Sequence, residues 1–362
     1  MDFSQKSNHI YLQLLEYIGK NKHCVLATVT STYGSTPQKP GSSAIFGRNK
    51  LLAGTVGGGA VELAIGEMAR KAIRSGKPGY FRFDLDNEIT DLEAAICGGG
   101  MSVLVDGAPQ KHIEIFETLR NSVKNRIPGV LVTFCGSETS KCDGITRIWV
   151  TSETMSEFIG KVPEEILSIV KEMLENSNPD EFREVVLKDS SASNLKMAFL
   201  ESIVPQIQLI IAGAGHVGKA LSHMAKLLDF EVTVWDDRPE FASKTKLPDA
   251  DKILSGNIEE SLGKIKVNKG SFIVIVTRGH KGDADVLKQF IGSDAGYIGM
   301  IGSHRKIAQV RESFLNNGWA TAEQWGKIYS PVGLEIGSKT VQEIAVSIAA
   351  QLVQVRNQLK KK

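Results

Sequence analysis

The chain has 362 residues, of which 42% are hydrophobic and 23% are charged, and its formal net charge at pH 7 is only +2. This length predicts two or three domains that each bury a core, and the near-neutral charge gives no reason to expect nucleic acid or a membrane as a partner. No apolar run approaches 18 residues and the N-terminus lacks a signal-peptide core, so we expect a cytoplasmic protein.

The first two hundred residues predict a mixed α+β domain. Apolar spacing indicates a helix over 9–20, a strand over 24–32, a hairpin over 43–53 and a helix that ends near Ser75. Further strands are expected at 80–85, 102–105, 130–134, 145–150, 185–187 and 195–203, with helices at 110–124 and 163–175. We place the domain boundary so that one domain spans 1–203 and the other spans 204–362.

Two glycine-rich segments stand out in this first domain. Gly57, Gly58 and Gly59 precede a helix, which suggests backbone that approaches a ligand; a simple glycine-capped turn is the alternative. Glu62 follows in the first helical turn and could simply complement the helix dipole. Cys97 comes before Gly98-Gly99-Gly100, where loop amides would favour a reactive thiolate, although a small residue filling a tight turn is also possible.

The other three cysteines suggest no special chemistry. Cys24 begins an apolar run and is expected to be a core thiol. Cys135 and Cys142 lack CxxC spacing, so we predict no zinc site, and a reducing cytosol argues against disulfides.

Residues 207–237 predict a Rossmann-type unit: strand, glycine-rich turn, helix, strand and acid. Gly213 allows the tight turn, Gly215 lets the backbone approach a phosphate, and Gly218 lets the helix pack closely on the strand. His216 lies within the same turn. Asp236 follows Gly213 by 23 residues, where an acceptor for a ribose hydroxyl is expected. A flexible glycine loop is the alternative.

The parallel α/β pattern continues with apolar runs at 272–276 and 297–301. Each run ends in a charged loop, and such loops lie at the ligand-binding edge of a parallel sheet. Ser303 is a natural helix N-cap. The cations of these loops could surround an anionic ligand or could simply be solvated; they are Arg278, His280, Arg305 and Lys306. A non-helical segment at 331–337 and a long helix at 341–359 complete the chain.

Several separate motifs in this order resemble the xanthine dehydrogenase accessory factor family, of the XdhC/CoxI type. They are GSTP at 34–37, GTVGGGAVE at 54–62, CGG at 97–99, GAGHVG at 213–218, TRGHKGD at 277–283, YIGMIGSHRK at 297–306 and SPVGLEIGSKTVQEIAVSI at 330–348. The resemblance implies an XdhC/CoxI α+β domain followed by a Rossmann-like, doubly wound parallel-sheet domain.

The resemblance also implies a function as a molybdenum cofactor chaperone. Such proteins bind the cofactor (molybdopterin, in a mono- or dinucleotide form), protect it while its sulfido ligand is installed, and deliver it to an apo molybdenum hydroxylase such as xanthine dehydrogenase. The implied partners are that apoenzyme, a cysteine desulfurase as sulfur donor and a second copy in a homodimer, and no catalytic site is implied. Cys97 would be the ligand of molybdenum.

The residues that we expect to bind the cofactor are Gly57, Gly58, Gly59, Glu62, Cys97, Gly98, Gly99, Gly213, Gly215, His216, Gly218, Asp236, Arg278, His280, Asp283, Ser303 and Arg305. Two alternatives stay open. One is an NAD(P)-dependent oxidoreductase, for which Asp236 would favour NAD. The other is a nucleotide-sensing regulatory protein without chemistry.

Overall fold

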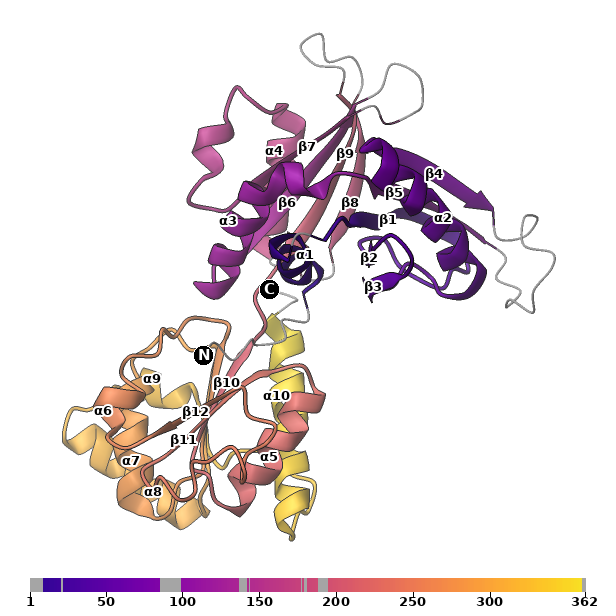
Figure 1. The fold of residues 1–362 in the computed structure, drawn as a ribbon. Coiled ribbons are helices and arrows are strands. Elements are labelled where there is room, and N and C mark those ends of the chain that lie inside the picture. Colours follow the sequence, from indigo (N-terminus) through magenta and orange to yellow (C-terminus); the bar gives the residue numbers. More distant parts are fainter. Residues whose placement is uncertain are drawn as a thin grey trace. The chain divides into compact units, whose positions relative to one another are not determined.

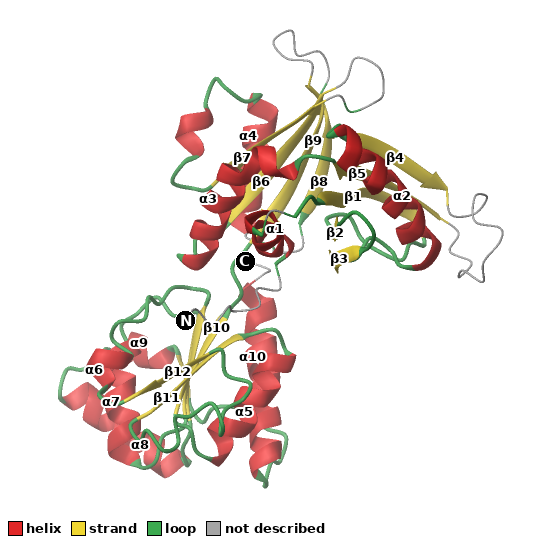
Figure 2. Cartoon of the chain, in the orientation of Figure 1, coloured by secondary structure: helices red, strands yellow, loops and turns green. Residues whose placement is uncertain are grey.

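The structure is a computed structural model that describes residues 9–20, 22–84, 99–136, 142, 144–176, 178, 181–187 and 195–359. The chain divides into two compact units, Met1–Pro205 and Gln206–Lys362 (Figure 1). Each unit has its own strands and helices (Figure 2).

The N-terminal unit is built on two antiparallel sheets. The order of strands is β3-β2-β1-β5-β4 in one sheet and β7-β6-β9-β8 in the other. The strands are β1 (Val25–Gly34), β2 (Ser43–Phe46), β3 (Leu51–Gly54), β4 (Gly79–Asp84), β5 (Gly99–Asp106), β6 (Gly129–Gly136), β7 (Gly144–Val150), β8 (Phe182–Val186) and β9 (Leu195–Ile203). The helices are α1 (Ile10–Gly19), α2 (Gly59–Ser75), α3 (Ile113–Lys124) and α4 (Glu164–Asn176).

Apolar spacing along each helix explains how these sheets are covered. The buried face of α2 carries Val61, Ile65 and Ala69, which join Val103 of β5 in one core. In the same way, α4 packs its apolar face on β6 and β9. The expected α+β architecture of this unit is therefore confirmed.

The C-terminal unit is a parallel six-stranded sheet with the order β12-β11-β10-β13-β14-β15. Numbered within the unit, this order is 3-2-1-4-5-6, which is the Rossmann order. The strands are β10 (Gln208–Ala212), β11 (Glu231–Asp236), β12 (Lys252–Ser255), β13 (Ser271–Ile275), β14 (Tyr297–Met300) and β15 (Ile328–Tyr329). The helices are α5 (His216–Leu227), α6 (Ile258–Ser261), α7 (His280–Phe290), α8 (His304–Asn316), α9 (Ala322–Gly326) and α10 (Val341–Leu359).

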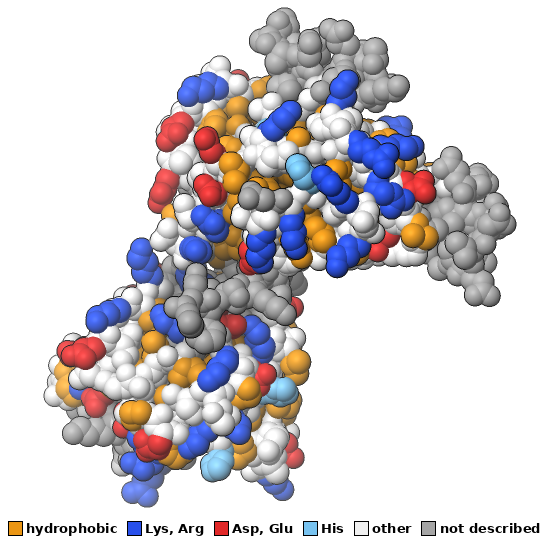
Figure 3. Space-filling model, in the orientation of Figure 1, with side chains coloured by type: hydrophobic (Ala, Val, Ile, Leu, Met, Phe, Trp, Pro, Cys, Tyr) orange, Lys and Arg blue, Asp and Glu red, His pale blue; other side chains and the backbone are white. Residues whose placement is uncertain are grey.

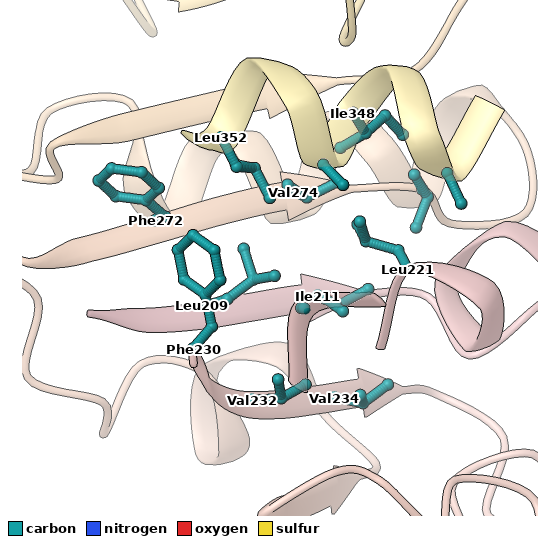
Figure 4. Close-up of a cluster of buried hydrophobic side chains, with 14 of the residues drawn as sticks. Leu209, Ile211, Leu221, Phe230, Val232, Val234, Phe272, Val274, Ile348 and Leu352 are labelled. Carbon is teal, nitrogen blue, oxygen red and sulfur yellow. The ribbon is translucent and has the colours of Figure 1, made fainter. Parts of the chain in front are cut away.

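Both faces of this parallel sheet are buried. On one face, Leu221 of α5 and the α10 residues Ile348 and Leu352 pack on Ile211 and Val274 (Figure 4). The other face packs against α7 and α8. Strands buried on both sides require continuous apolar runs, and β10 and β13 are buried along their whole lengths.

The structure corrects one expectation about the cysteines. Cys24 is buried and free, as expected, but Cys135 and Cys142 form a disulfide. Cys135 lies near the end of β6, and the β6–β7 hairpin turns back so that the two Cα atoms are 5.5 Å apart. Sequence spacing alone did not reveal this approach.

Within the part of the chain that the structure describes, five short elements were not predicted from sequence: the 3₁₀ helix Met155–Phe158, β12, α6, α9 and β15. Each has five residues or fewer, too few for a helical or alternating period to be read. Among the described residues, no helix combines the length and apolarity that crossing a membrane requires.

Candidate functional site

The glycine turn before α2 consists of backbone conformations that only glycine adopts readily. Gly57, Gly58 and Gly59 have φ values of 139°, 69° and 53°, and Gly58 is the N-cap of the helix. A Cβ atom at Gly58 or Gly59 would meet no other heavy atom within 4 Å. The start of this 17-residue helix therefore presents backbone with open space beside it.

Glu62 closes this turn from within the helix. Its Oε1 accepts hydrogen bonds from the Thr55 hydroxyl at 2.6 Å and from the Val56 amide at 3.3 Å. The carboxylate therefore fixes the entry to the turn, in addition to lying near the positive end of the helix dipole. Glu62 thus has a positioning role that sequence analysis did not identify.

The segment Gly34–Pro37 contacts both this turn and the start of β5. A Cβ atom at Gly57 would lie 3.1 Å from Pro37 Cγ, so the segment containing Gly34–Pro37 packs against the turn. Gly34 also pairs with Gly99 at the start of β5, and a Cβ atom at Gly99 would overlap Tyr33 O. The structure therefore places Gly99 beside the Gly34–Pro37 segment, which in turn contacts the glycine turn before α2.

Ser35 and Pro37 were quoted only as part of the GSTP motif and not as candidate site residues, although Ser35 lies against Gly99 and Pro37 against Gly57. Cys97 and Gly98 lie outside the described residues. Gly99, which is two residues beyond Cys97, marks where that segment enters β5.

Two of the three glycines in the Rossmann turn, Gly213 and Gly218, are closely packed. Gly213 has a φ of 119°, and a Cβ atom there would lie 2.9 Å from Thr277 N. A Cβ atom at Gly218 would overlap Gly213 O, whereas one at Gly215 would meet nothing within 4 Å. His216 is exposed and begins α5. The tight turn expected at Gly213 and the close helix packing expected at Gly218 agree with this geometry.

Asp236 ends β11 beside this turn and is almost fully buried. Its carboxylate accepts a hydrogen bond from Ala214 N at 2.7 Å and is paired with the Arg238 guanidinium. Burial opposes ionisation of this carboxyl, but the hydrogen bonds from Arg238 and Ala214 outweigh that effect and lower its pKa. Asp236 therefore holds the glycine turn in place.

A second buried acid holds the loop after β13. Asp283 accepts hydrogen bonds from Thr277 N at 3.1 Å and from the Thr277 hydroxyl at 2.5 Å. Its other oxygen is paired with the Lys306 ammonium. Because Asp283 neutralises Lys306, this lysine is not a free cation for an anionic ligand, contrary to the expectation from sequence.

The remaining predicted residues lie around this edge of the sheet. Arg278 and Arg305 are exposed. Ser303 is the N-cap of α8 and accepts a hydrogen bond from Lys306 N at 3.3 Å, as expected. His280 begins α7. Because Gly213 packs against Thr277, the glycine turn and the loop after β13 lie side by side at the carboxyl ends of the strands.

A cavity of about 510 Å³ lies at the opposite end of this sheet, where β14 and β15 begin. It is lined by Tyr297, which begins β14, and by Tyr329 and Val355. None of the residues predicted to bind a ligand lines it. The chemistry-bearing groups and this cavity therefore mark different ends of the same sheet.

A polar cluster is buried between the two sheets of the N-terminal unit. Arg147 is paired with Asp106, and the Tyr11 hydroxyl donates to Glu201. Burial raises the pKa of Glu201 to about 7, although the Tyr11 hydrogen bond and the Arg147 charge act in the other direction. This carboxyl is therefore partly protonated near neutral pH.

Lys and Arg side chains gather on the side of the N-terminal unit that carries α2 (Figure 3). Arg70, Lys71 and Arg74 are all exposed along this helix. Within the described part of the chain, no group of three or more His, Cys, Asp or Glu residues could hold a metal ion. The geometry thus offers amides and cations, which suit anionic ligands.

Comparison with known proteins matches two segments of the chain to related family models. Residues 209–352 match the XdhC Rossmann domain, and residues 18–84 match the XdhC and CoxI family. A protein of Bacillus subtilis, named as a probable subunit of xanthine dehydrogenase, is 24% identical over 348 residues, which cover 93% of this chain and 94% of that protein.

Two further similarities have different extents. The uncharacterized protein YqeB of Escherichia coli is 30% identical over 154 residues, covering 41% of this chain and 27% of that protein. A crystal structure of a xanthine dehydrogenase from Bacillus halodurans has a TM-score of 0.65 at 23% identity and covers 96% of both chains. At that identity, the last similarity shows a shared fold.

Proposed function

Because the chain belongs to the XdhC and CoxI family, we propose that it is an accessory protein that binds molybdenum cofactor. It protects the cofactor while the terminal sulfido ligand is installed, and it then delivers the cofactor to an apo molybdenum hydroxylase such as xanthine dehydrogenase. The name of the Bacillus subtilis relative, a probable subunit of xanthine dehydrogenase, supports an association with that class of enzyme.

The observation that carries the proposal is the open glycine turn before α2, which lies within the segment matched to the family. The cofactor carries a phosphate on its pterin, and the backbone amides at a helix start favour such an anion. Gly58 and Gly59 leave space beside this backbone that a side chain would fill. The residues present therefore fit a phosphorylated ligand.

Cys97 is the residue that we propose to meet the metal. A thiolate is a soft ligand of the kind that suits a metal already bound to sulfur. Gly99 fixes the end of this segment against the Gly34–Pro37 segment. Once delivered, the cofactor supplies the metal centre of the receiving enzyme, whereas this chain binds, orients and shields it.

The direct test is to purify the protein from a host that makes molybdopterin, oxidise the bound pterin and measure its fluorescence. Wild type should release the fluorescent product, and Cys97→Ala should retain roughly ten- to a hundredfold less, because a lost ligand costs about 1–3 kcal/mol. Cys24→Ala is the matched thiol control, since Cys24 is buried in the core. The absence of pterin from folded wild type would refute the proposal.

Delivery requires a second measurement. Loaded protein mixed with apo xanthine dehydrogenase should restore hydroxylase activity, and a cysteine desulfurase should increase that activity by supplying sulfur. The exposed cations of α2 would complement an acidic surface on the receiving enzyme. Transfer that is as fast without this protein as with it would contradict the role in delivery. A homodimer stays a prediction, which sedimentation can check.

The two nucleotide-dependent alternatives receive less support. An NAD(P)-dependent oxidoreductase would use Asp236 as its acceptor for the ribose, but this carboxylate already binds Ala214 and Arg238. A nucleotide-sensing module would meet the same obstacle. Both alternatives would therefore require Arg238 to release the Asp236 carboxylate.

A further inference from the structure

The hydrogen-bonding capacity of Asp236 is filled by the protein itself. Its Oδ1 accepts from Arg238 N at 3.0 Å and from Arg238 Nε at 2.9 Å, and its Oδ2 accepts from Ala214 N at 2.7 Å and from Arg238 Nη2 at 3.1 Å. An ionised carboxylate offers about four lone-pair positions. All of them are engaged, and the side chain is only 4% exposed.

Arg238 is held in this position from its other side. Its Cζ lies 3.9 Å from the centre of the Phe241 ring, and Phe241 N donates to Arg238 O at 3.0 Å. A two-point contact with a carboxylate and a stacked ring together restrict a guanidinium group. Arg238 therefore covers Asp236 as a fixed part of the fold.

In a Rossmann domain that binds a dinucleotide, the acid at this position accepts hydrogen bonds from the ribose hydroxyls. We propose that Arg238 is a specificity-determining residue that closes this sugar position. The domain then discriminates against ligands that must be held by a 2′,3′-diol, such as NAD and FAD. A ligand that enters here is held through its phosphate and not through its ribose.

This inference goes beyond the proposed function, and it does not depend on molybdenum cofactor. It has one consequence for the cofactor, which does rest on the proposed function. In a dinucleotide form, the ribose of the added nucleotide could not use Asp236 as its acceptor. The form without the nucleotide would meet no such restriction.

The test compares ADP with 2′-deoxy-ADP by calorimetric titration of the full chain, without molybdenum cofactor. Wild type should bind both weakly and with equal affinity. Arg238→Ala frees acceptor positions on Asp236, so ADP should bind at least tenfold tighter than 2′-deoxy-ADP, as expected for a hydrogen bond to a charged group. Arg238→Met keeps an unbranched stem against Phe241 and should behave in the same way if Arg238→Ala fails to fold.

Lys246→Ala is the matched control. Lys246 Nζ also lies over the Phe241 ring, at 4.3 Å from its centre, and Asp236 accepts no hydrogen bond from it. This variant should keep the equal affinities of wild type.

Three results would overturn the proposal. The first is a wild-type protein that binds ADP more tightly than 2′-deoxy-ADP, because the protein would then contact the ribose 2′-hydroxyl even though Arg238 occupies Asp236. The second is a folded Arg238 variant that gains no preference. The third is tight binding of a 2′-phosphorylated nucleotide by wild type, because Arg238 would then be a phosphate ligand instead of a seal.

Discussion

In the N-terminal unit the glycine turn requires positive backbone φ angles at all three glycines, whereas in the C-terminal unit only Gly213 has such an angle and both Gly213 and Gly218 are needed for close packing. Gly57–Gly59 all have positive φ values, with open space beside two of them. Gly218 has no such angle, but a Cβ atom there would overlap Gly213 O. Similar runs of glycine thus answer different physical demands.

The acids that hold the two turns differ in the same way. Glu62 comes from the helix that the turn begins, so its contacts with Thr55 and Val56 are local. Asp236 comes from the neighbouring strand β11, so its contact with Ala214 exists only once the sheet has formed. The N-terminal turn is therefore stabilised locally, and the C-terminal turn depends on tertiary structure.

Gly218→Ala tests most directly whether close packing requires glycine in the C-terminal turn. The added methyl group would overlap backbone, so we expect a loss of about 3 kcal/mol in the free energy of unfolding, despite the better helix propensity of alanine. Denaturant unfolding measures this loss. Gly215→Ala is the control, because its methyl group enters open space, and it should change stability by no more than about 1 kcal/mol. Equal effects of the two changes would contradict the packing account.

The tertiary acid should matter more than the local one. Asp236→Asn removes the buried carboxylate charge that pairs with Arg238, and it should lower the free energy of unfolding by about 2 kcal/mol. Glu62→Gln should lower it by about 1 kcal/mol. Chemical unfolding of both variants, followed by near-ultraviolet circular dichroism, makes the comparison. A larger loss for Glu62→Gln would reverse the ranking of the two turns.

The contribution of Asp236 should also depend on pH. Its pKa is lowered in the folded state, so its stabilising effect is present above the unfolded pKa of about 3.9 and disappears as the pH falls through the lower folded value. Thermal unfolding of wild type and Asp236→Asn should therefore differ at pH 6 and converge as the pH falls below 4. A constant difference over this range would exclude the ion pair as its cause.

The smallest effect on stability is expected at the Gly57–Gly59 turn, where positive φ angles and not packing require glycine. Gly58→Ala places a side chain at a φ of 69° in open space, which should cost about 1 kcal/mol. Gly76→Ala is matched to it, since Gly76 has a φ of 64° and also faces open space at the other end of α2. The two variants should unfold alike, but only Gly58→Ala should lose bound pterin. Equal retention by both would remove this turn from the binding site.

Sequence patterns were sufficient for the elements with a clear period. The long helix at 341–359 and the apolar strands β10 and β13 follow directly from their hydrophobic spacing. The glycine turn at 213–218 and the position of Asp236 at the end of β11 were also predictable. These features depend on residues that are close together in the chain.

The side-chain contacts of the two buried acids, Asp236 and Asp283, could not be predicted from sequence patterns in the same way. Whether Asp236 is free for a ribose depends on the path of the chain at Arg238 and Phe241, and no repeating pattern encodes that path. The pairing of Asp283 with Lys306 joins the first turns of α7 and α8, across 23 residues of sequence. Such contacts appear only when the strand order has placed these helix starts side by side.

The short edge strands of the C-terminal sheet have a consequence for solubility. A strand at a sheet edge offers unpaired backbone groups to other chains, and long edges promote aggregation. Here β15 has two residues, and β12 has four with Lys252 exposed at its start. Another chain would find little backbone to pair with at either edge. Such a sheet can present the carboxyl ends of its strands to solvent without exposing a long template for intermolecular sheet growth.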